Sequence, residues 1–531
     1  PFHPFVKISA PILQKPKNCD RIAMHAKSGG SGKPFALFFY IKLSAKNTEE
    51  TVQGLKGHFS RVFHRHPVRF CNENGGYMAQ QRIRSMTEGS PVKLLISFAL
   101  PLMVGNVFQQ LYTVVDTAVV GQVVGVGALA SLGAADWLNW MTLGIIQGFT
   151  QGFAILMAQY FGAKDYRQLS RSVGASVTLS AIAALLLLAV SQLAILPVLG
   201  LLNTPADILG GSVLYLRIMF GGIPIVAAYN LLASILRALG DSKTPLYAVV
   251  LATFVNIALD LLFVMGFHWG IGGAAGATVF AQAVSTIYCY GNVRKITIIR
   301  LEKTDFKLQR DMVTALLRLG SPVAMQNAII SVGGMVVQSV VNRFGMLFIA
   351  GFTATNKLYG ILEIAATSYG YAVTSYVGQN LGAKLLARIR QGMRAAALVA
   401  LITSMVIAAA MLLFGKSILG LFISGTPEEI EASMAIAYHY LALMSLGLPI
   451  LYMLHIYRSA LMGLGDTVIP MSSGFVEMAV RIGIALFLPL AIGQEGIYYA
   501  EVGAWTGAAL LLVAGYYVRM HGLSQREQRA L

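Results

Sequence analysis

Long apolar runs separated by short basic stretches dominate the chain after about residue 90. Several runs contain no Asp, Glu, Lys or Arg, namely 172–206, 218–236, 319–342, 364–383, 395–415, 432–457 and 502–518. Most are long enough to cross a bilayer as a helix, which takes about 20 residues. A β-barrel would instead alternate apolar and polar positions. The pattern therefore predicts an all-α polytopic membrane protein.

The runs predict twelve transmembrane helices, six in each half of the chain. The first six are expected at 93–119, 128–158, 173–201, 208–236, 245–267 and 272–293. The second six are expected at 314–342, 348–379, 395–421, 431–462, 470–492 and 497–518. These spans predict an N-lobe at 86–293, a cytoplasmic linker at 294–312, a C-lobe at 313–519 and a cytoplasmic tail at 520–531.

Basic residues gather in three of the loops, at 164–171, 294–310 and 384–394. The turns between them have no Lys or Arg, at 121–127, 203–207, 268–272, 424–428 and 493–496. Because basic loops stay cytoplasmic, we expect both termini on the inner side of a bacterial plasma membrane. The net charge of +17 then reflects these loops and a basic leader, and no nucleic-acid partner is expected.

An internal repeat relates the two halves. The motif Q-Y-F-G-A-K at 159–164 recurs as Q-N-L-G-A-K at 379–384, and G-D-S-K-T-P at 240–245 recurs as G-D-T-V-I-P at 465–470. Six spans per half make the halves parallel repeats, so we expect two pseudo-symmetric six-helix bundles. Two matched lobes are typical of an alternating-access transporter. The alternative is a duplicated structural bundle that transports nothing.

Residues 1–85 read as a poorly structured basic leader with no secretory signal. Met78 follows N-G-G-Y, and consecutive glycine codons can contain a ribosome-binding sequence. We hypothesise that residues 1–77 are translated upstream sequence and that the native protein starts at Met78. The alternative is a basic extension that contacts anionic lipid. Three cysteines without metal spacing argue against a disulfide framework.

Polar side chains within the predicted spans of the first half indicate a cation site, since charges at membrane depth are costly and rarely idle. Asp116 shares a helix face with Gln109 and Tyr112. Asp260 lies one turn after Asn256 in the fifth span, and Thr278 lies among small residues of the sixth. Two ionised carboxylates in a dry lobe would repel each other, so the pair is expected to bind H⁺ or Na⁺. The alternative is that Asp260 only bonds a neighbouring helix and Asp116 lies near water.

The second half has a different set of charges. Glu477 and Arg481 have the i, i+4 spacing of an ion pair on one helix, expected to be structural, with a gating or substrate role as the alternative. Glu363 either lines the central cavity and attracts a cationic substrate or is a bystander. Asp241 and Asp466 occupy short loops and are expected to cap turns or helices.

From Met86 onward the chain resembles the multidrug and toxic compound extrusion (MATE) family, in its bacterial DNA-damage-inducible-like branch. The residues that carry the resemblance are M-T-E-G-S-P-V-K-L-L (86–95), Q-Q-L-Y-T-V-V-D-T (109–117), A-Q-Y-F-G-A-K-D (158–165), L-R-A-L-G-D (236–241), N-I-A-L-D (256–260) and V-G-Q-N-L-G-A-K (377–384). The resemblance implies two six-helix lobes and antiport driven by H⁺ or Na⁺. It places Asp116, Asn256, Asp260 and Thr278 at the cation site of the first lobe, and Gln109, Tyr112 and Asn230 on polar positions lining the same lobe. A site built on acids of the second lobe is not expected, because 319–342 and 432–457 carry no charge.

These observations predict a secondary active multidrug efflux transporter that exchanges cationic or amphipathic drugs for H⁺ or Na⁺ by alternating access. The alternative is a flippase for a lipid-linked precursor, which would need a cationic cavity for pyrophosphate. No nucleotide-binding loop or catalytic triad is present in the sequence, so we expect neither an ATP pump nor an enzyme. No cofactor is expected, no metal beyond Na⁺ at the cation site, and nothing requires more than a monomer in the bilayer.

Overall fold

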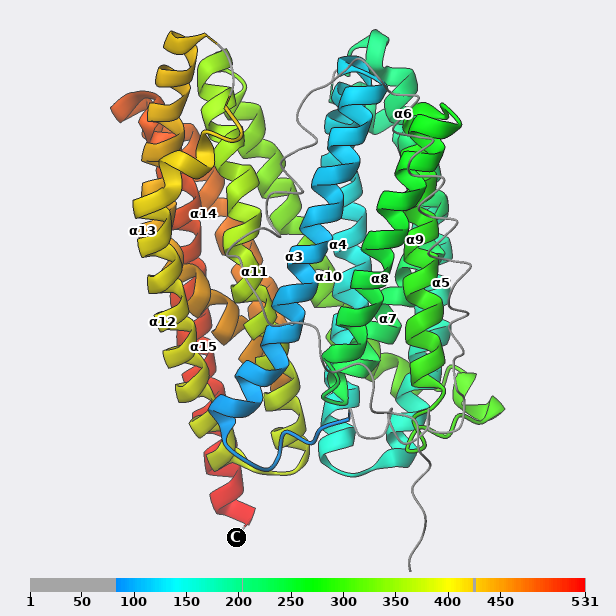
Figure 1. Cartoon of the computed structure of the whole chain (residues 1–531). Coiled ribbons are helices and arrows are strands. Elements are labelled where there is room, and N and C mark those ends of the chain that lie inside the picture. The colour runs from blue at the N-terminus through cyan, green and yellow to red at the C-terminus, as the bar shows by residue number, and fades with distance from the viewer. Residues whose placement is uncertain (1–82, 203, 424–425, 531) are drawn as a thin grey trace, which may run out of the picture. The chain divides into compact units, whose positions relative to one another are not determined.

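The computed structural model describes residues 83–202, 204–423 and 426–530. The leader prediction, including the hypothesis about Met78, lies almost entirely outside these residues. Every regular element in the described chain is a helix (Figure 1). The N-lobe comprises α3 (Pro91–Val123), α4 (Val126–Gly162), α5 (Tyr166–Leu201), α6 (Ala206–Gly221), α7 (Ile223–Ala238), α8 (Lys243–Asp260), the π-helical η1 (Leu261–Gly266) and α9 (Gly270–Val293).

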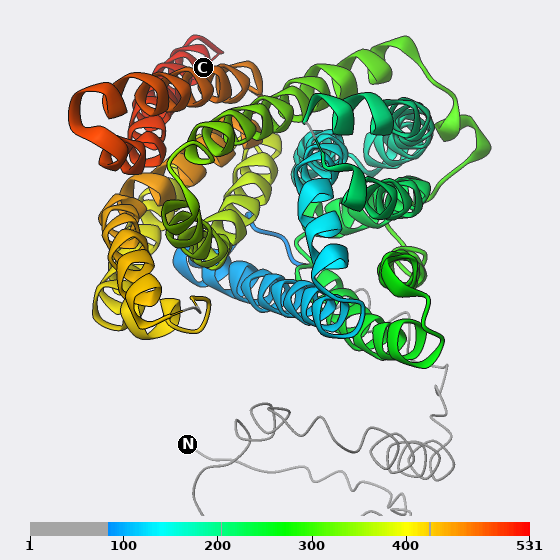
Figure 2. The same cartoon turned by 90° about the horizontal axis from the view of Figure 1, so that it is seen from above.

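The C-lobe follows a linker that contains one 3₁₀ turn, η2 (Lys303–Phe306). Its elements are α10 (Arg310–Val341), α11 (Met346–Gly382), α12 (Leu386–Leu419), α13 (Pro427–Gly463), α14 (Val468–Ile492), the 3₁₀ turn η3 (Gly493–Tyr498) and α15 (Tyr499–Ala530). Counting α6 and α7 as one broken span gives twelve helices in the described residues, which confirms the predicted fold class. Seen along the helices, the two lobes form separate groups (Figure 2).

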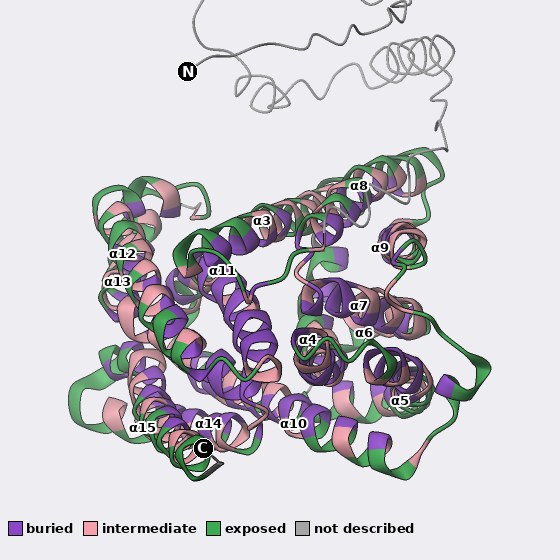
Figure 3. Cartoon of the chain, turned by 90° about the horizontal axis from the view of Figure 1, so that it is seen from below, coloured by how far each residue is buried: buried purple, intermediate pink, exposed green. Residues whose placement is uncertain are grey.

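Most of these helices are suited to a bilayer. Nine stretches are long and apolar enough to cross a membrane in the described chain, and the bent pair α6–α7 makes a tenth. One of the nine, at 468–529, contains both α14 and α15. The more polar α11 lies between the lobes, and its residues 372–380 are buried throughout (Figure 3).

The fourth span is broken, although the sequence predicted one helix at 208–236. The axes of α6 and α7 differ by 47°. Pro224 supplies no backbone N–H for a continuous helix. Gly222 allows close packing here, because a Cβ at this position would lie 2.7 Å from Cγ2 of Val279. In the second half the equivalent Pro449 lies inside the continuous α13, so the repeat does not extend to this bend.

The backbone confirms the repeat at the two motifs. Lys164 and Lys384, which end the Q-x-x-G-A-K motifs, both have φ of 59°, which is uncommon for a residue with a side chain. Gly240 and Gly465, which open the G-D motifs, have φ of 84° and 78°. The same residue in each half therefore makes the same left-handed turn.

The two aspartates of the G-D motifs cap the helices that follow them, as predicted. Asp241 Oδ1 accepts the backbone N–H groups of Lys243 and Thr244, each at 3.0 Å. Asp466 Oδ1 accepts the N–H of Ile469 at 3.3 Å. These carboxylates therefore satisfy backbone N–H groups at the N-termini of the helices that follow.

The repeated motifs meet each other across the lobes. Gln379 Nε2 donates to the carbonyl of Ala238 at 2.9 Å, and Gln159 Nε2 donates to the carbonyl of Gly463 at 3.1 Å. We call these two bonds the glutamine latches. The acceptors lie two residues before the G-D motifs, so each latch joins the Q-x-x-G-A-K motif of one lobe to the G-D motif of the other.

Two glycines allow the close approach at the latches. A Cβ at Gly162 would overlap the carbonyl group of Gln379, and a Cβ at Gly382 would overlap that of Gln159. Both Q-x-x-G-A-K motifs end where a basic loop begins. The two lobes are therefore in direct contact at the end of the molecule that carries these loops, which we call the basic-loop end. The helices of the two lobes diverge toward the other end (Figure 1).

A short segment, residues 83–90, crosses the same end and contacts both lobes; we call it the N-terminal strap. Arg84 N–H donates to the carbonyl of Leu239 in the N-lobe at 3.3 Å. Met86 N–H donates to Gln379 Oε1 in the C-lobe at 2.7 Å, and Asn380 Nδ2 donates to the Met86 carbonyl at 3.1 Å. The Met86 side chain is buried, so the strap is packed as well as bonded.

The first helix of each lobe also packs into the opposite lobe. Side chains from the start of α3, including Leu94 and Phe98, belong to the hydrophobic core of the C-lobe. Side chains from the start of α10, including Leu316 and Leu319, belong to a core of the N-lobe. The lobes are therefore joined at the basic-loop end by apolar packing as well as by hydrogen bonds.

Candidate cation site and the C-lobe charge network

Two buried acids of the N-lobe lack hydrogen-bond partners. Asp116 on α3 is 7% exposed and Asp260, the last residue of α8, is fully buried. Oδ1 of Asp116 and both carboxylate oxygens of Asp260 have no hydrogen-bond partner among the described residues. The two side chains lie within electrostatic range of each other. The structure thus brings together the two acids that the sequence singled out.

Further oxygen atoms surround this pair. Asn256 Nδ2 donates to Thr278 Oγ1 at 3.4 Å, which leaves the buried Oδ1 of Asn256 without a described partner. Tyr112 lies within range of Asp116 and interacts with the side chains of Gln109 and Gln282. Carboxylate, amide and hydroxyl oxygens therefore converge where α3, α8 and α9 pack together.

Two members of this cluster were not found from the sequence. Tyr215 on α6 is buried and lies within electrostatic range of Asp116 and Asp260. Asp136 on α4 is a neighbour of Asp116 and also interacts with Lys357 of the C-lobe. Neither shares a helix with the predicted site residues, so no spacing in the sequence could connect them. Only the packing of α4 against α3, and of α6 against α4 and α9, does so.

Asn230, which the sequence placed on the lining of this lobe, has a local partner. Its Nδ2 donates to the carbonyl of Val226 on the same helix at 2.9 Å. Such a bond to the i−4 carbonyl satisfies the amide within α7. This bond directs the amide nitrogen of Asn230 to its own helix and not to the acid pair.

The arrangement fits a small cation. A charged group at the centre of a bilayer costs about 2.5–3.5 kcal/mol on insertion scales, and two neighbouring carboxylates add mutual repulsion. A bound proton or Na⁺ removes most of that cost by neutralising the pair. Oxygen donors of this kind suit either ion, so the geometry supports a site that alternates between a neutral and a charged state.

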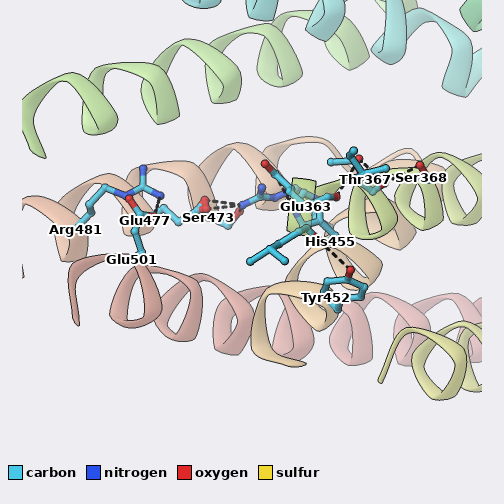
Figure 4. Close-up of polar contacts among 12 residues, drawn as sticks. Glu363, Thr367, Ser368, Tyr452, His455, Ser473, Glu477, Arg481 and Glu501 are labelled. Atoms are coloured by element: carbon cyan, nitrogen blue, oxygen red, sulfur yellow. Dashed lines mark hydrogen bonds and ion pairs between the residues drawn. The ribbon is translucent and has the colours of Figure 1, made fainter. Parts of the chain in front are cut away.

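The predicted ion pair between Glu477 and Arg481 is wrong. Glu477 instead binds Arg458 of α13, with Nη2 and Oε2 2.9 Å apart, and Arg481 binds Glu501 of α15 at 2.8 Å (Figure 4). The i, i+4 spacing puts both residues on one side of α14, but that side faces two other helices that carry opposite charges. Interhelical partners therefore replace the neighbour on the same helix.

Glu363 of α11 has a partner too. His455 Nε2 of α13 lies 3.2 Å from Glu363 Oε1 (Figure 4). We refer to the three pairs together as the C-lobe charge network. Sequence reasoning missed three of its members, although Arg458 and Glu501 lie at the borders of the uncharged runs 432–457 and 502–518. A charge directly beside such a run is the signal that was available.

A sequence model of the MatE family matches residues 101–262 and again residues 322–487. The chain belongs to the MatE family. The double match follows the internal repeat, and as a MatE-family member the protein is a multi-pass membrane transporter. Within the family, it is 28% identical over 436 residues to "Probable multidrug resistance protein YoeA" of Bacillus subtilis, covering 79% of this chain and 92% of the relative. It is 29% identical over 350 residues to "DNA damage-inducible protein F" of Escherichia coli, covering 63% and 73%.

Solved structures show the same fold. A MOP superfamily transporter from Pyrococcus furiosus superposes with a TM-score of 0.77 at 21% identity, over 85% of this chain and 99% of that one. A multidrug resistance MATE family transporter described as outward-facing gives the same TM-score, identity and coverage. The two-lobed architecture is thus the one that MATE transporters have.

Proposed function

We propose that this protein is a secondary active multidrug efflux transporter of the bacterial inner membrane that exchanges organic cations for H⁺ or Na⁺. The observation that carries the proposal is the buried pair Asp116 and Asp260, in which Oδ1 of Asp116 and both carboxylate oxygens of Asp260 lack described hydrogen-bond partners. An antiporter needs a group that is stable only while it holds its coupling ion. Unpartnered carboxylates in a bilayer meet that need.

The charge state of the pair would bias the two conformations of the transporter. With the cation bound, the N-lobe site is neutral and compatible with a dry, closed lobe. Release of the cation restores two repelling charges, which favours a wetter arrangement of α3, α8 and α9. A ligand shifts a conformational equilibrium only through such a difference in interaction free energy. The same negative charge attracts a cationic substrate.

The nature of the charges favours cationic substrates over a lipid-linked pyrophosphate. The N-lobe cluster contains Asp116, Asp136 and Asp260. The buried arginines of the C-lobe network, Arg458 and Arg481, are each bound to a glutamate. A pyrophosphate site would instead require arginines free to bind its oxygens. Relatives named as multidrug resistance and multidrug export proteins support the same substrate class.

The proposal is tested by efflux of a fluorescent organic cation such as ethidium from proteoliposomes, with H⁺ and Na⁺ gradients imposed separately. We expect one of the two gradients to drive efflux by the wild-type protein. Asp260→Asn should abolish the driven component, because an amide neither binds nor releases a proton and carries no charge for Na⁺. Asp207→Asn, an exposed acid on α6, is the matched control. Undiminished efflux by Asp260→Asn would remove the pair from the mechanism.

A further inference from the structure

The C-lobe charge network connects four helices through three interhelical ion pairs (Figure 4). It contains three carboxylates, two guanidinium groups and one imidazole. Arginine stays protonated in proteins, so the two arginines balance two of the three carboxylates. One negative charge remains until the imidazole takes up a proton. The network is therefore neutral in only one of its two protonation states.

The three pairs differ in their access to the surroundings. The Arg458 and Glu477 side chains are 10% and 4% exposed, and those of Arg481 and Glu501 are 6% and 16% exposed. His455 is 14% exposed and Glu363 is 31% exposed. The pair that can change its charge thus contains the most exposed side chain of the network, that of Glu363.

We propose that Glu363 and His455 form a second proton-binding site, located in the C-lobe, whose occupation neutralises the C-lobe charge network. The proposal rests on the proposed function, because it adds a second coupling site to the same antiporter. Histidine is the side chain that most readily changes its charge near neutral pH, and a carboxylate at hydrogen-bond distance stabilises the imidazolium. The proton joins the imidazole, and the Glu363 carboxylate holds it in place.

The other groups around Glu363 are committed elsewhere. Arg458 of α13 and Arg481 of α14 lie within its electrostatic range, but each is bound to its own glutamate. Tyr452 of α13 donates its hydroxyl to the carbonyl of Leu362 at 3.0 Å. Further titratable neighbours of Glu363 in the described chain are Tyr359 on the same helix and Glu501 on α15, and α3 presents the amide of Gln110 near Gly360. None of these supplies a further positive charge, so we assign the proton to the imidazole.

The position of the pair allows it to influence transport. Glu363 lies on α11, which with α12 packs against α3 of the N-lobe. Five residues after Glu363, Ser368 Oγ accepts a hydrogen bond from Asn106 Nδ2 of α3 at 3.3 Å. A change of charge at Glu363 and His455 therefore occurs beside the contact between the lobes. Each lobe would then carry one ion-dependent element.

The test measures proton release when the purified full-length protein binds ethidium in weakly buffered detergent solution with a pH-indicator dye. The variants are Glu363→Gln, His455→Gln and the double variant. His439→Gln is the matched control, because His439 is exposed on the same helix and contacts the ring of Tyr498. The double variant leaves two carboxylates facing two guanidinium groups, so it keeps a balanced network even if a single variant folds poorly.

We expect the wild type and the control His439→Gln to release the same number of protons per bound ethidium. His455→Gln, Glu363→Gln and the double variant should each release about one proton fewer, because binding at coupled sites is reciprocal. In proteoliposomes the same three variants should lose about 5-fold or more of the efflux driven by a pH gradient, the lower range of coupling between sites. Wild-type proton release by the double variant would overturn the second site.

Failure of the second site differs from failure of the proposed function. If the double variant behaves as the wild type while Asp260→Asn is inactive, the N-lobe mechanism stands and the C-lobe site is wrong. If Asp260→Asn transports normally, the proposed N-lobe mechanism is wrong. A third outcome concerns the ion. If the double variant differs from the wild type in its response to Na⁺ but not in its response to pH, the network binds Na⁺ and the assignment of a proton is overturned.

Discussion

The buried acids of the two lobes differ in whether they have hydrogen-bond or ion-pair partners. In the N-lobe, Asp116 and Asp260 have oxygens with no described hydrogen-bond partner. In the C-lobe, Glu477 and Glu501 each bind an arginine. An unpartnered buried acid is a site for an exchangeable ion, whereas a paired acid is costly to disturb, since removing one partner leaves a buried charge uncompensated.

Replacing Glu477 tests the structural side of this contrast. Glu477→Gln leaves Arg458 charged and buried, so we expect it to lower the free energy of unfolding by about 3–5 kcal/mol. The double variant Arg458→Met/Glu477→Leu should recover most of that loss, because it removes both charges. Thermal unfolding in detergent measures both effects. A double variant no more stable than Glu477→Gln would contradict the prediction.

The sequence predicted the acids of the N-lobe better than the ion pairs of the C-lobe, for a physical reason. Asp116, Tyr112, Asn256 and Asp260 were found because helical spacing and membrane depth constrain them within one segment. The pairing of Glu477 was predicted wrongly because a partner on another helix has no fixed spacing in the sequence. Partners such as Tyr215 depend in the same way on how whole helices are rotated against one another.

Among the elements, the helix ends at the basic-loop end determine how closely the lobes approach. The fold class and the repeat could be predicted because both follow from runs and motifs along the chain. The break between α6 and α7 was missed, because Pro224 and Pro449 look equivalent in sequence and each follows a closely packed glycine two residues earlier, Gly222 or Gly447.

Adding a methyl group at the latches should separate the lobes at this end. Gly162→Ala and Gly382→Ala each place a Cβ against a glutamine carbonyl of the other lobe. We expect a larger distance between spin labels at the exposed positions Lys243 and Ala387, measured by double electron–electron resonance. Gly291→Ala on α9, where a Cβ would meet nothing within 4 Å, is the control. An unchanged distance in all three variants would show that the lobes tolerate the methyl group.

In the described molecule as a whole, one glutamine joins three segments. Gln379 accepts from Met86 of the strap and donates to Ala238 of the N-lobe, although it belongs to the C-lobe. Gln159 makes the equivalent latch, but no segment of the described chain donates to its amide oxygen as the strap does to that of Gln379. The closed basic-loop end is thus held unequally by the two halves.

Removing the Gln379 side-chain bonds should release this end more than removing those of Gln159. Gln379→Leu loses two buried hydrogen bonds at about 1 kcal/mol each and strands the Met86 N–H and the Ala238 carbonyl. Gln159→Leu loses one. Double electron–electron resonance between the labels at Lys243 and Ala387 measures the fraction of protein in which the basic-loop end is open. This fraction should be higher for Gln379→Leu than for Gln159→Leu. Equal fractions for the two variants would assign no role to the strap.

The glutamine latches also bear on the history of the molecule. Before duplication, a half-length chain with six spans could make this bond twice only by associating with another copy of itself about a two-fold axis, as isologous dimers do. Fusion of the copies would preserve both bonds and free each half to change separately. The strap beside one latch, and the different burial of acids in the two lobes, are the asymmetries that a homodimer could not have acquired.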